Sequence, residues 1–215
     1  MDLLRAQAEA IGDRRNAPHT RLKIQIAVAS LLQTSGYKTL SVDAICRESG
    51  LSRPGFYKHF RNKEEAVLAL LQRFAGTEQQ LVMSLVDCDD LAQALVKICN
   101  GFLGFHLGSG ALLSTMVEMR KTVPEAYKIW RNRADYLLES IFSQLERFEP
   151  FRGLDREWAE FAFAATFRAL YVTVDELSSH PSPVTRRYSG DIDQLAQMFA
   201  RQLHGALLAE PLSSE

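Results

Sequence analysis

A tight turn between two short helical segments constrains this chain more than any other feature of its sequence. Residues 42–48 have the pattern of a short helix, and Gly50 follows where a backbone of positive φ is favoured just past a helix end. Ser52 is placed to cap a second helix with Pro54 in its first turn, where the missing N–H costs nothing. This order is typical both of a helix-turn-helix and of an ordinary helical hairpin.

The segment after the turn favours the helix-turn-helix. Phe56 and Phe60 are four residues apart and can anchor one face of a short helix in a core. Lys63 stands in the first turn of the next helix, where it opposes the helix dipole, so an external phosphate explains it better than intrahelical electrostatics. The side chains left on or near the far side of the short helix are Arg53, Tyr57, Lys58 and His59.

This region resembles the DNA-binding domain of the tetracycline-repressor (TetR) family. The residues that carry the resemblance are Ile24, Ala27, Val28, Leu31, Gly36, Tyr37, Ser41, Val42, Ile45, Gly50, Leu51, Ser52, Phe56, Tyr57, Phe60, Lys63 and Glu64. The resemblance implies phosphate contacts from Tyr57, Lys63 and Ser41, and it implies that Arg53 lies nearest the bases. The candidate DNA-binding residues are Ser41, Ser52, Arg53, Pro54, Gly55, Tyr57, Lys58, His59 and Lys63.

Some positions depart from the family pattern. Pro54 and Gly55 stand where the family often has a glycine followed by a hydroxyl residue, which puts one phosphate contact in doubt, and Ile26 replaces a usual polar residue. Glycine inside a helix is less stable than alanine by about 1 kcal/mol. We therefore interpret Gly55 as a place where the DNA surface comes too close for a side chain.

Charge is divided unequally along the 215 residues. Residues 1–75 contain 12 Lys or Arg and 7 Asp or Glu, net +5, whereas residues 76–215 contain 13 and 19, net −6. The basic part is the part expected to read DNA, and the overall charge of −1 argues against a general nucleic-acid coat. Cys46, Cys88 and Cys99 form no C-x-x-C pair and are expected to be buried, reduced thiols. No apolar run approaches membrane-spanning length, which predicts a cytoplasmic chain with no membrane partner.

The rest of the sequence predicts an all-α chain. An N-terminal arm at 1–19 is followed by a three-helix helix-turn-helix DNA-binding domain at 20–75 and a larger helical ligand-binding and dimerisation domain at 76–215. Arg14 and Arg15 of the arm either reach a minor groove or are simply solvated. The predicted helices cover residues 20–35, 42–48, 53–60, 63–85, 91–107, a stretch ending near 120, 124–148, 155–177 and 191–208, with a loop at 178–188.

The last two predicted helices carry more apolar surface than a monomer core requires. Residues 155–177 present apolar side chains on two sides, and a helix that is apolar nearly all round must be buried nearly all round. The resemblance implies a four-helix dimer interface built from these two helices of each subunit. DNA geometry supports a homodimer independently, because recognition helices read successive major grooves when they are about 34–36 Å apart.

A small-molecule pocket in the larger domain is a further expectation. Aromatic and methionine side chains at helical spacing are usually plain core, so the resemblance is what makes a small, mostly apolar effector the prediction. Arg168 stands in an apolar helix and is expected to be buried. Its partner is expected to be a ligand carboxylate or an acidic side chain such as Asp135, Glu139 or Glu176, in the core or across the dimer. The candidate ligand-binding residues are Phe102, Phe105, His106, Met116, Met119, Tyr127, Trp130, Tyr136, Phe163, Phe167, Arg168 and Tyr171.

An enzyme is the competing class. The five histidines show no metal-ligand spacing with one another or with cysteine, and there is no phosphate-binding glycine loop or nucleophile elbow. We therefore expect no catalysis, no cofactor and no metal. The sequence favours a homodimeric transcriptional repressor that a small-molecule effector releases from double-stranded operator DNA. A DNA-binding dimer whose large domain binds no effector is the alternative that stays open.

Overall fold

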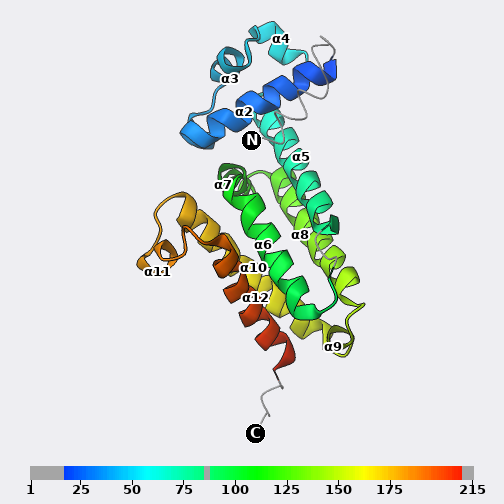
Figure 1. The fold of residues 1–215 in the computed structure, drawn as a ribbon. Coiled ribbons are helices and arrows are strands. Elements are labelled where there is room, and N and C mark those ends of the chain that lie inside the picture. The colour runs from blue at the N-terminus through cyan, green and yellow to red at the C-terminus, as the bar shows by residue number, and fades with distance from the viewer. Residues whose placement is uncertain (1–16, 85–87, 210–215) are drawn as a thin grey trace. The chain divides into compact units, whose positions relative to one another are not determined.

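The computed structural model describes residues 17–84 and 88–209, and within these ranges all regular structure is helical. The predicted all-α fold is confirmed, with no strand in the described residues (Figure 1). The N-terminal arm, with Arg14 and Arg15, lies almost wholly outside these ranges. The helices are α2 (Ala17–Thr39), α3 (Val42–Ser49), α4 (Arg53–Tyr57), α5 (Lys63–Ser84), α6 (Leu91–Leu107), α7 (Gly110–Met119), α8 (Pro124–Leu145), α9 (Glu149–Arg152), α10 (Arg156–Ser178), α11 (Pro183–Arg186) and α12 (Ile192–Leu208).

The chain forms two compact units. The first unit runs to Gly76 and also contains Ala111–Arg131, and the second unit contains Thr77–Gly110 and the chain from Asn132 onward. Helices α5, α7 and α8 therefore contribute residues to both units. The sequence-based division near residue 75 placed residues 111–131 in the larger domain, whereas the structure groups them with the first unit.

The first unit is built on the apolar face of α2. Ile24 and Val28 on α2 are fully buried, as are Ile45 on α3 and Phe56 on α4, which gives the three-helix core expected from the spacing of these residues. Gly36 has a φ of 73° and interrupts the helical backbone of α2, where the sequence predicted a helix end.

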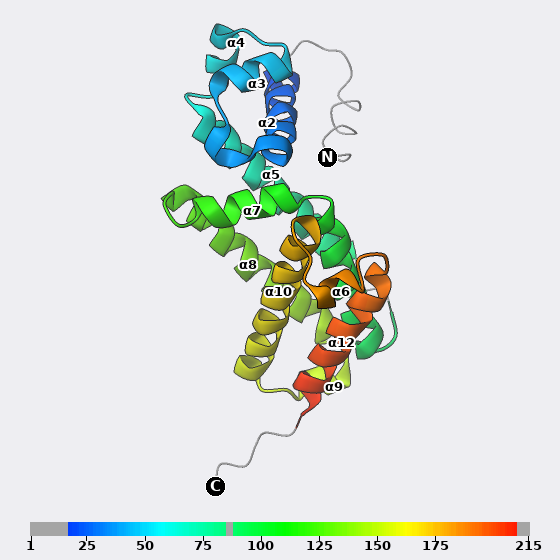
Figure 2. The same cartoon turned by 90° about the vertical axis from the view of Figure 1, so that its left-hand side faces the viewer.

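The second unit is held together mainly by three long helices. Helices α6, α10 and α12 pack on one another (Figure 2). Asp90, Asp155 and Asp191 cap them, each accepting a hydrogen bond at 2.8 Å from the backbone N–H three residues on. The largest fully buried side chains of this core are Leu95, Ile98, Leu103, Phe142 and Phe163.

Two short helices were not predicted. Helix α9 directly follows the predicted end of one long helix at Phe148, and α11 lies within the predicted loop 178–188. Both have four residues with proline in the first turn, and four residues are too few to show a hydrophobic period. The hydroxyl of Ser182, which accepts from the N–H of Thr185 at 3.2 Å, is the local signal for α11.

Candidate nucleic-acid interface

The turn between α3 and α4 has the geometry that its residues predict. Gly50 caps α3 in the left-handed conformation, with a φ of 69°, and its N–H bonds back to the end of that helix. Ser52 then caps α4, because its hydroxyl accepts a hydrogen bond from the N–H of Gly55 at 3.2 Å. Helix α4 ends at Tyr57, three residues before the predicted limit at Phe60.

Helix α4 and the residues that follow it have two chemically different faces. Phe56 and Phe60 are 0% and 1% exposed, so the pair anchors the segment in the core of the first unit, as predicted. Gly55 and His59 are half-buried. The side chains exposed to solvent on this segment are Ser52, Arg53, Pro54, Tyr57 and Lys58.

Arg53 is held beside the turn by two neighbours. Its Nη1 lies 3.2 Å from a carboxylate oxygen of Asp43 on α3. A hydrogen bond with Tyr57 is the main cause that raises the pKa of Arg53, and the charge of Asp43 adds to it. The guanidinium is therefore a permanent positive charge at the N-terminal end of α4, the part of a recognition helix that faces base edges.

Lys63 makes an internal contact that the sequence did not indicate. Its Nζ donates to the carbonyl of Leu40 at 2.7 Å and lies 5.0 Å from the ring centre of Tyr37. Leu40 directly precedes Ser41, whose hydroxyl caps α3 by accepting from the N–H of Ala44 at 3.2 Å. Lys63 thus ties α5 to the start of α3. An ammonium has three N–H donors, so this bond leaves capacity for a phosphate.

Two other basic residues near α4 serve the fold. Arg21 donates to the carbonyl of His59 at 2.9 Å and lies over the ring of Phe60 at 4.2 Å. Arg61 donates through its backbone N–H and its Nε to Glu65, and these bonds lower the pKa of that carboxyl group. Arg21 and Arg61 are therefore engaged within the fold, whereas Lys58 is exposed and Arg53 is exposed beside its partners Asp43 and Tyr57.

A contact within the chain explains why glycine is favoured at position 55. A Cβ at this position would lie 3.3 Å from the hydroxyl oxygen of Ser52, the atom that caps α4. Such a contact is tight enough that the cap must shift to admit a methyl group. The close approach of DNA inferred from the sequence is thus not the sole explanation for this glycine.

The candidate ligand-binding residues lie in both units. Those in the first unit are Met116, Met119, Tyr127 and Trp130, and those in the second are Phe102, Phe105, His106, Tyr136, Phe163, Phe167, Arg168 and Tyr171. In the second unit, Phe163, Phe167, Phe102 and His106 form a chain of ring contacts with successive centroid distances of 6.1, 5.1 and 4.2 Å. These side chains pack on one another.

The remaining candidates divide between interior and surface. Met116 and Met119 are 0% and 1% exposed, whereas Tyr127 and Tyr136 are 51% and 43% exposed. Trp130 is half-buried beneath the guanidinium of Arg120, which lies 4.3 Å from its ring centre. A ligand pocket at these residues stays a prediction.

Arg168 is exposed in the single chain, so the expectation that it is buried in the core of one chain is wrong, and burial across a dimer stays a prediction. Two of the acids proposed as its partners are engaged elsewhere. Glu139 pairs with Arg156 at 2.7 Å, and Glu176 accepts a hydrogen bond from Thr185. The apolar neighbours that suggested burial belong to a helix with two apolar faces, one of which faces solvent in the single chain.

The buried arginine of the second unit is Arg133 instead. It is 5% exposed and donates from Nη2 to Oε1 of Glu78 at 2.6 Å, and from Nε to Oε2 of the same carboxylate. Nε2 of His106 lies 2.7 Å from Oε1 of Glu78, so α5, α6 and α8 meet at one carboxylate. Of this cluster, sequence reasoning singled out His106 alone, because Glu78 and Arg133 stand among polar residues typical of a solvated face.

Burial and charge set the protonation of this cluster. Burial lowers the pKa of His106 and the charge of Arg133 lowers it further, while the bond to Glu78 opposes both. Burial by itself would raise the pKa of Glu78, but the guanidinium of Arg133 and the bond from His106 outweigh it and lower that pKa. The cluster is therefore a carboxylate that accepts from a guanidinium and from a neutral imidazole.

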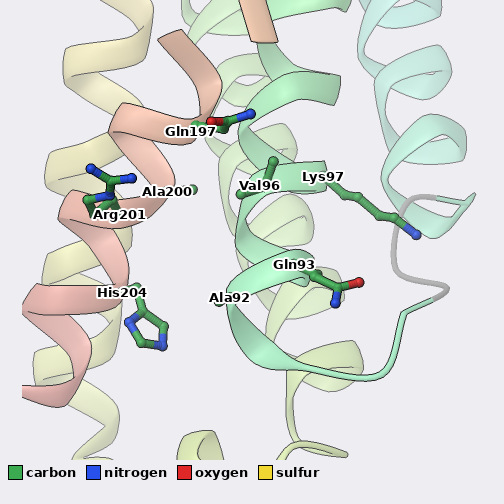
Figure 3. A pocket seen from close by; sticks show the side chains of 8 residues that line it. All are labelled: Ala92, Gln93, Val96, Lys97, Gln197, Ala200, Arg201 and His204. Carbon is green, nitrogen blue, oxygen red and sulfur yellow. The ribbon is translucent and has the colours of Figure 1, made fainter. Parts of the chain in front are cut away.

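A surface groove lies between α6 and α12, with a volume of about 490 Å³ (Figure 3). In Figure 3, Gln197 and His204 extend from α12 toward α6, and Lys97 extends away from α12. The residues that line it are Ala92, Gln93, Val96, Lys97, Gln197, Ala200, Arg201 and His204. The groove therefore differs from the predicted aromatic pocket.

The described ranges 17–84 and 88–209 contain neither a candidate membrane span nor a candidate metal site. No helix there is long and apolar enough to cross a membrane. No group of three or more His, Cys, Asp or Glu side chains there is arranged to hold a metal ion. Cys46 and Cys99 are buried free thiols, as predicted, whereas Cys88 is half-exposed. Burial raises the pKa of Cys99 to about 12.

Comparison with known proteins agrees with this geometry. Residues 27–70 match the family described as "Bacterial regulatory proteins, tetR family". The chain is 36% identical over 62 residues to the HTH-type transcriptional activator FasR of Mycolicibacterium smegmatis. These 62 residues make up 29% of this chain and 28% of that protein. It is 27% identical over 131 residues to the HTH-type transcriptional regulator EthR of the same organism, 59% of this chain and 57% of that protein. The chain thus spans less than two thirds of each curated relative.

Solved structures share the fold over most of the chain. The fatty acid degradation regulator FadR from Bacillus halodurans superposes with a TM-score of 0.69 at 20% identity, covering 90% of this chain and 98% of that one. The family match covers α3, α4 and the turn between them, and the fold extends through the remaining helices. Over residues 27–70, which contain the turn between α3 and α4, this chain is therefore similar to the tetR family of bacterial regulatory proteins.

Proposed function

We propose that this protein is a sequence-specific DNA-binding transcriptional regulator that reads the major groove of operator DNA with α4. The observation that carries this proposal is the two-faced α4 segment behind a capped turn. Phe56 and Phe60 fix the segment in the core, while Arg53, Tyr57 and Lys58 face solvent. Side chains of these types bind base edges and phosphates.

The division of roles on this surface is part of the proposal. Arg53 stands in the first turn of α4, where a recognition helix meets base edges, and its guanidinium can bind guanine with two hydrogen bonds. Tyr57, Lys63 and Ser41 have hydroxyl or ammonium groups suited to phosphate oxygens. Ser52, Pro54, Gly55, Lys58 and His59 complete the proposed DNA surface.

Charge reversal on α4 tests the proposal. The double variant R53E/K58E places two carboxylates where phosphate or bases should lie, and it should abolish selection of genomic DNA fragments by the purified protein. The matched control is R186E/R187E, which reverses two exposed cations of the second unit. We expect the control to bind like wild type, and equal losses in both variants would contradict a role for α4.

The proposed regulator acts as a homodimer through α10 and α12. Two copies of α4 about 34–36 Å apart would read two half-sites one helical turn apart. Exposed apolar side chains on these two helices support a docking face, since Phe161 is 61% exposed, Trp158 44% and Met198 46%.

The regulator is most simply a repressor whose effector is a small, mostly apolar molecule. Helix α5 carries Lys63 in the first unit and Glu78 in the second, so a tilt of this one helix would move the DNA-binding unit. An effector releases DNA only if it binds better to the form that cannot bind DNA. A coupling of about 1–3 kcal/mol is typical and gives roughly 5- to 150-fold weaker DNA binding.

A DNA-binding dimer without an effector is the second candidate. It is favoured by the ring contacts among Phe102, His106, Phe163 and Phe167, because these predicted pocket residues already fill space against one another. A thermal-shift screen of small apolar compounds separates the two candidates. The effector proposal requires compounds that raise the Tm and also weaken DNA binding, whereas the alternative predicts that none does both.

A further inference from the structure

Helix α10 exposes a regularly spaced row of side chains, which we call the α10 seam. Spacings along it alternate between three and four residues, as in the line of contact between two paired helices. All six members are exposed in the single chain, and Phe161 and Val172 are 61% and 55% exposed. The α10 seam consists of Trp158, Phe161, Ala165, Arg168, Val172 and Asp175.

The aromatic end of the seam is already ordered. The rings of Trp158 and Phe161 stack with centroids 5.8 Å apart and planes 24° apart. Nε1 of Trp158 donates to the carbonyl of Ala206 on α12 at 2.8 Å. Because the indole N–H already has its partner, another chain can cover Trp158 and Phe161 without leaving a donor of the indole unsatisfied.

Arg168 differs from Trp158 in its hydrogen bonding. It interrupts an otherwise small and apolar stretch of the seam, between Ala165 and Val172, and it is exposed. Among the described residues, no hydrogen bond or ion pair engages its guanidinium. If the seam is covered, this charge needs a partner supplied by whatever covers it.

A second copy of the chain can supply that partner. In a two-fold interface, residue i meets residue j of the partner and j meets i, so a single face must be complementary to itself. When two α10 seams run antiparallel with the axis between Phe161 and Ala165, each large ring faces a small side chain. The same alignment brings Arg168 opposite the partner's Trp158.

Electrostatics separates this register from the next one. In the proposed register the two Arg168 residues are ten positions apart along the helices, which is about 15 Å at 1.5 Å per residue. Moving the axis to lie between Ala165 and Arg168 pairs Phe161 with the partner's Val172. It also brings the two arginines within three positions, about 4.5 Å along the axis. Like charges that close at a covered interface are destabilising.

We propose that a second copy of this chain docks on the α10 seam in this antiparallel register, with Phe161 on the partner's Ala165 and Arg168 over the face of the partner's Trp158. Arginine is suited to this place, because its planar guanidinium stacks on an indole ring. The proposal rests on the homodimer of the proposed function, and it assigns Arg168 the role of fixing the register.

Thiol cross-linking tests the register directly. An equimolar mixture of the F161C and A165C proteins, allowed to exchange subunits and then oxidised, should give disulfide-linked dimers faster than either variant alone. The comparison mixture is F161C with V172C, which pairs the positions that meet in the competing register. Wild type, with its three native cysteines, gives the background. Faster cross-linking of the F161C and V172C mixture would overturn the proposed register.

The contact between arginine and indole has its own test. The two-fold dimer contains this contact twice, so sedimentation equilibrium should show that R168A weakens dimerisation by roughly 5- to 900-fold, the range of two partly to fully covered cation–π contacts. In a W158L background the same R168A change should have little further effect. Equal effects of R168A with and without Trp158 would contradict this contact.

Failure of this inference can be told from failure of the homodimer. Wild-type protein that sediments as a monomer at micromolar concentration would overturn both. A wild-type dimer that cross-links through F161C and V172C would overturn the register and leave the homodimer standing. DNA selection by the first unit's α4 is a separate measurement and decides neither outcome.

Discussion

Arg133 and Glu78 are 55 residues apart in the sequence and form a two-point ion pair in the interior of the second unit. The carboxylate also accepts from His106, so three helices are joined at one buried acid. Buried ion pairs are not in general more stabilising than well-packed apolar residues. Removing one partner of such a pair is strongly destabilising, however, because the other partner then remains buried with an uncompensated charge.

Removing one member of this pair should therefore be severe. R133M leaves the carboxylate of Glu78 buried with its main partner lost, and we expect the free energy of unfolding to fall by roughly 3–5 kcal/mol. Urea denaturation measures this change. The matched control is E160Q, which breaks the partly exposed pair with Arg156 and should cost at most about 1 kcal/mol. Similar losses of unfolding free energy in both variants would show that breaking the buried pair is no more destabilising than breaking an exposed one.

The same cluster predicts a loss of stability in acid. The pKa of His106 is lowered from 6.5, so below this pH the unfolded chain takes up a proton that the folded chain resists. Glu78, whose pKa is lowered from 4.5, acts in the same direction at lower pH. Between pH 7.5 and 5.5 we expect His106 to remove up to about 1.4 kcal/mol. Denaturant unfolding of H106Q should lack this loss, and a slope identical to that of wild type would contradict the assignment.

Roles at the DNA surface can be separated by substitution. K63A should weaken binding to all DNA sequences about equally and reduce the salt dependence by about one unit. R53A should lose discrimination at one base pair by on the order of 10-fold to 100-fold. Fluorescence anisotropy with matched and mismatched duplexes measures both effects. Because Lys63 also bonds to Leu40, the Tm of K63A must be measured alongside; equal loss of discrimination in both variants would end this division of roles.

Gly55→Ala has two opposed effects on stability. Alanine should gain about 1 kcal/mol in helix propensity, but its Cβ crowds the Ser52 hydroxyl that caps α4, a cap worth about 1 kcal/mol. We expect no net change in wild type and a gain of stability in an S52A background. A gain of the same size in both backgrounds would show that the cap tolerates the methyl group. Reduced DNA affinity of G55A would support close approach of the DNA.

The elements read correctly from the sequence have local causes. Gly50, Ser52, Phe56 and Phe60 lie within one turn and one short helix, so their roles follow from caps and from a four-residue spacing. Arg168 is exposed in the single chain although its neighbours along the helix are apolar, because one apolar face of α10 faces solvent there. The alternation of three and four residues from Trp158 to Asp175 is the sequence pattern that supports the proposed docking of another helix on this face.

The buried cluster could not be predicted in the same way. Glu78 and Arg133 are distant in sequence, and each stands beside polar residues, so neither shows an apolar surrounding. Only the packing of α5, α6 and α8 brings them together. The hydrogen bond from Lys63 to the carbonyl of Leu40 could not be predicted from the sequence either, because it depends on how α5 packs against the start of α3.

Two copies of α4 are proposed to read adjacent major grooves. Selection of bound sequences from a random duplex library, followed by footprinting of the selected site, tests it most directly. We expect a two-fold symmetric sequence with protected half-sites about 10 base pairs apart, or a multiple of that spacing. Binding without any enriched sequence, or protection that persists in R53E/K58E, would contradict it.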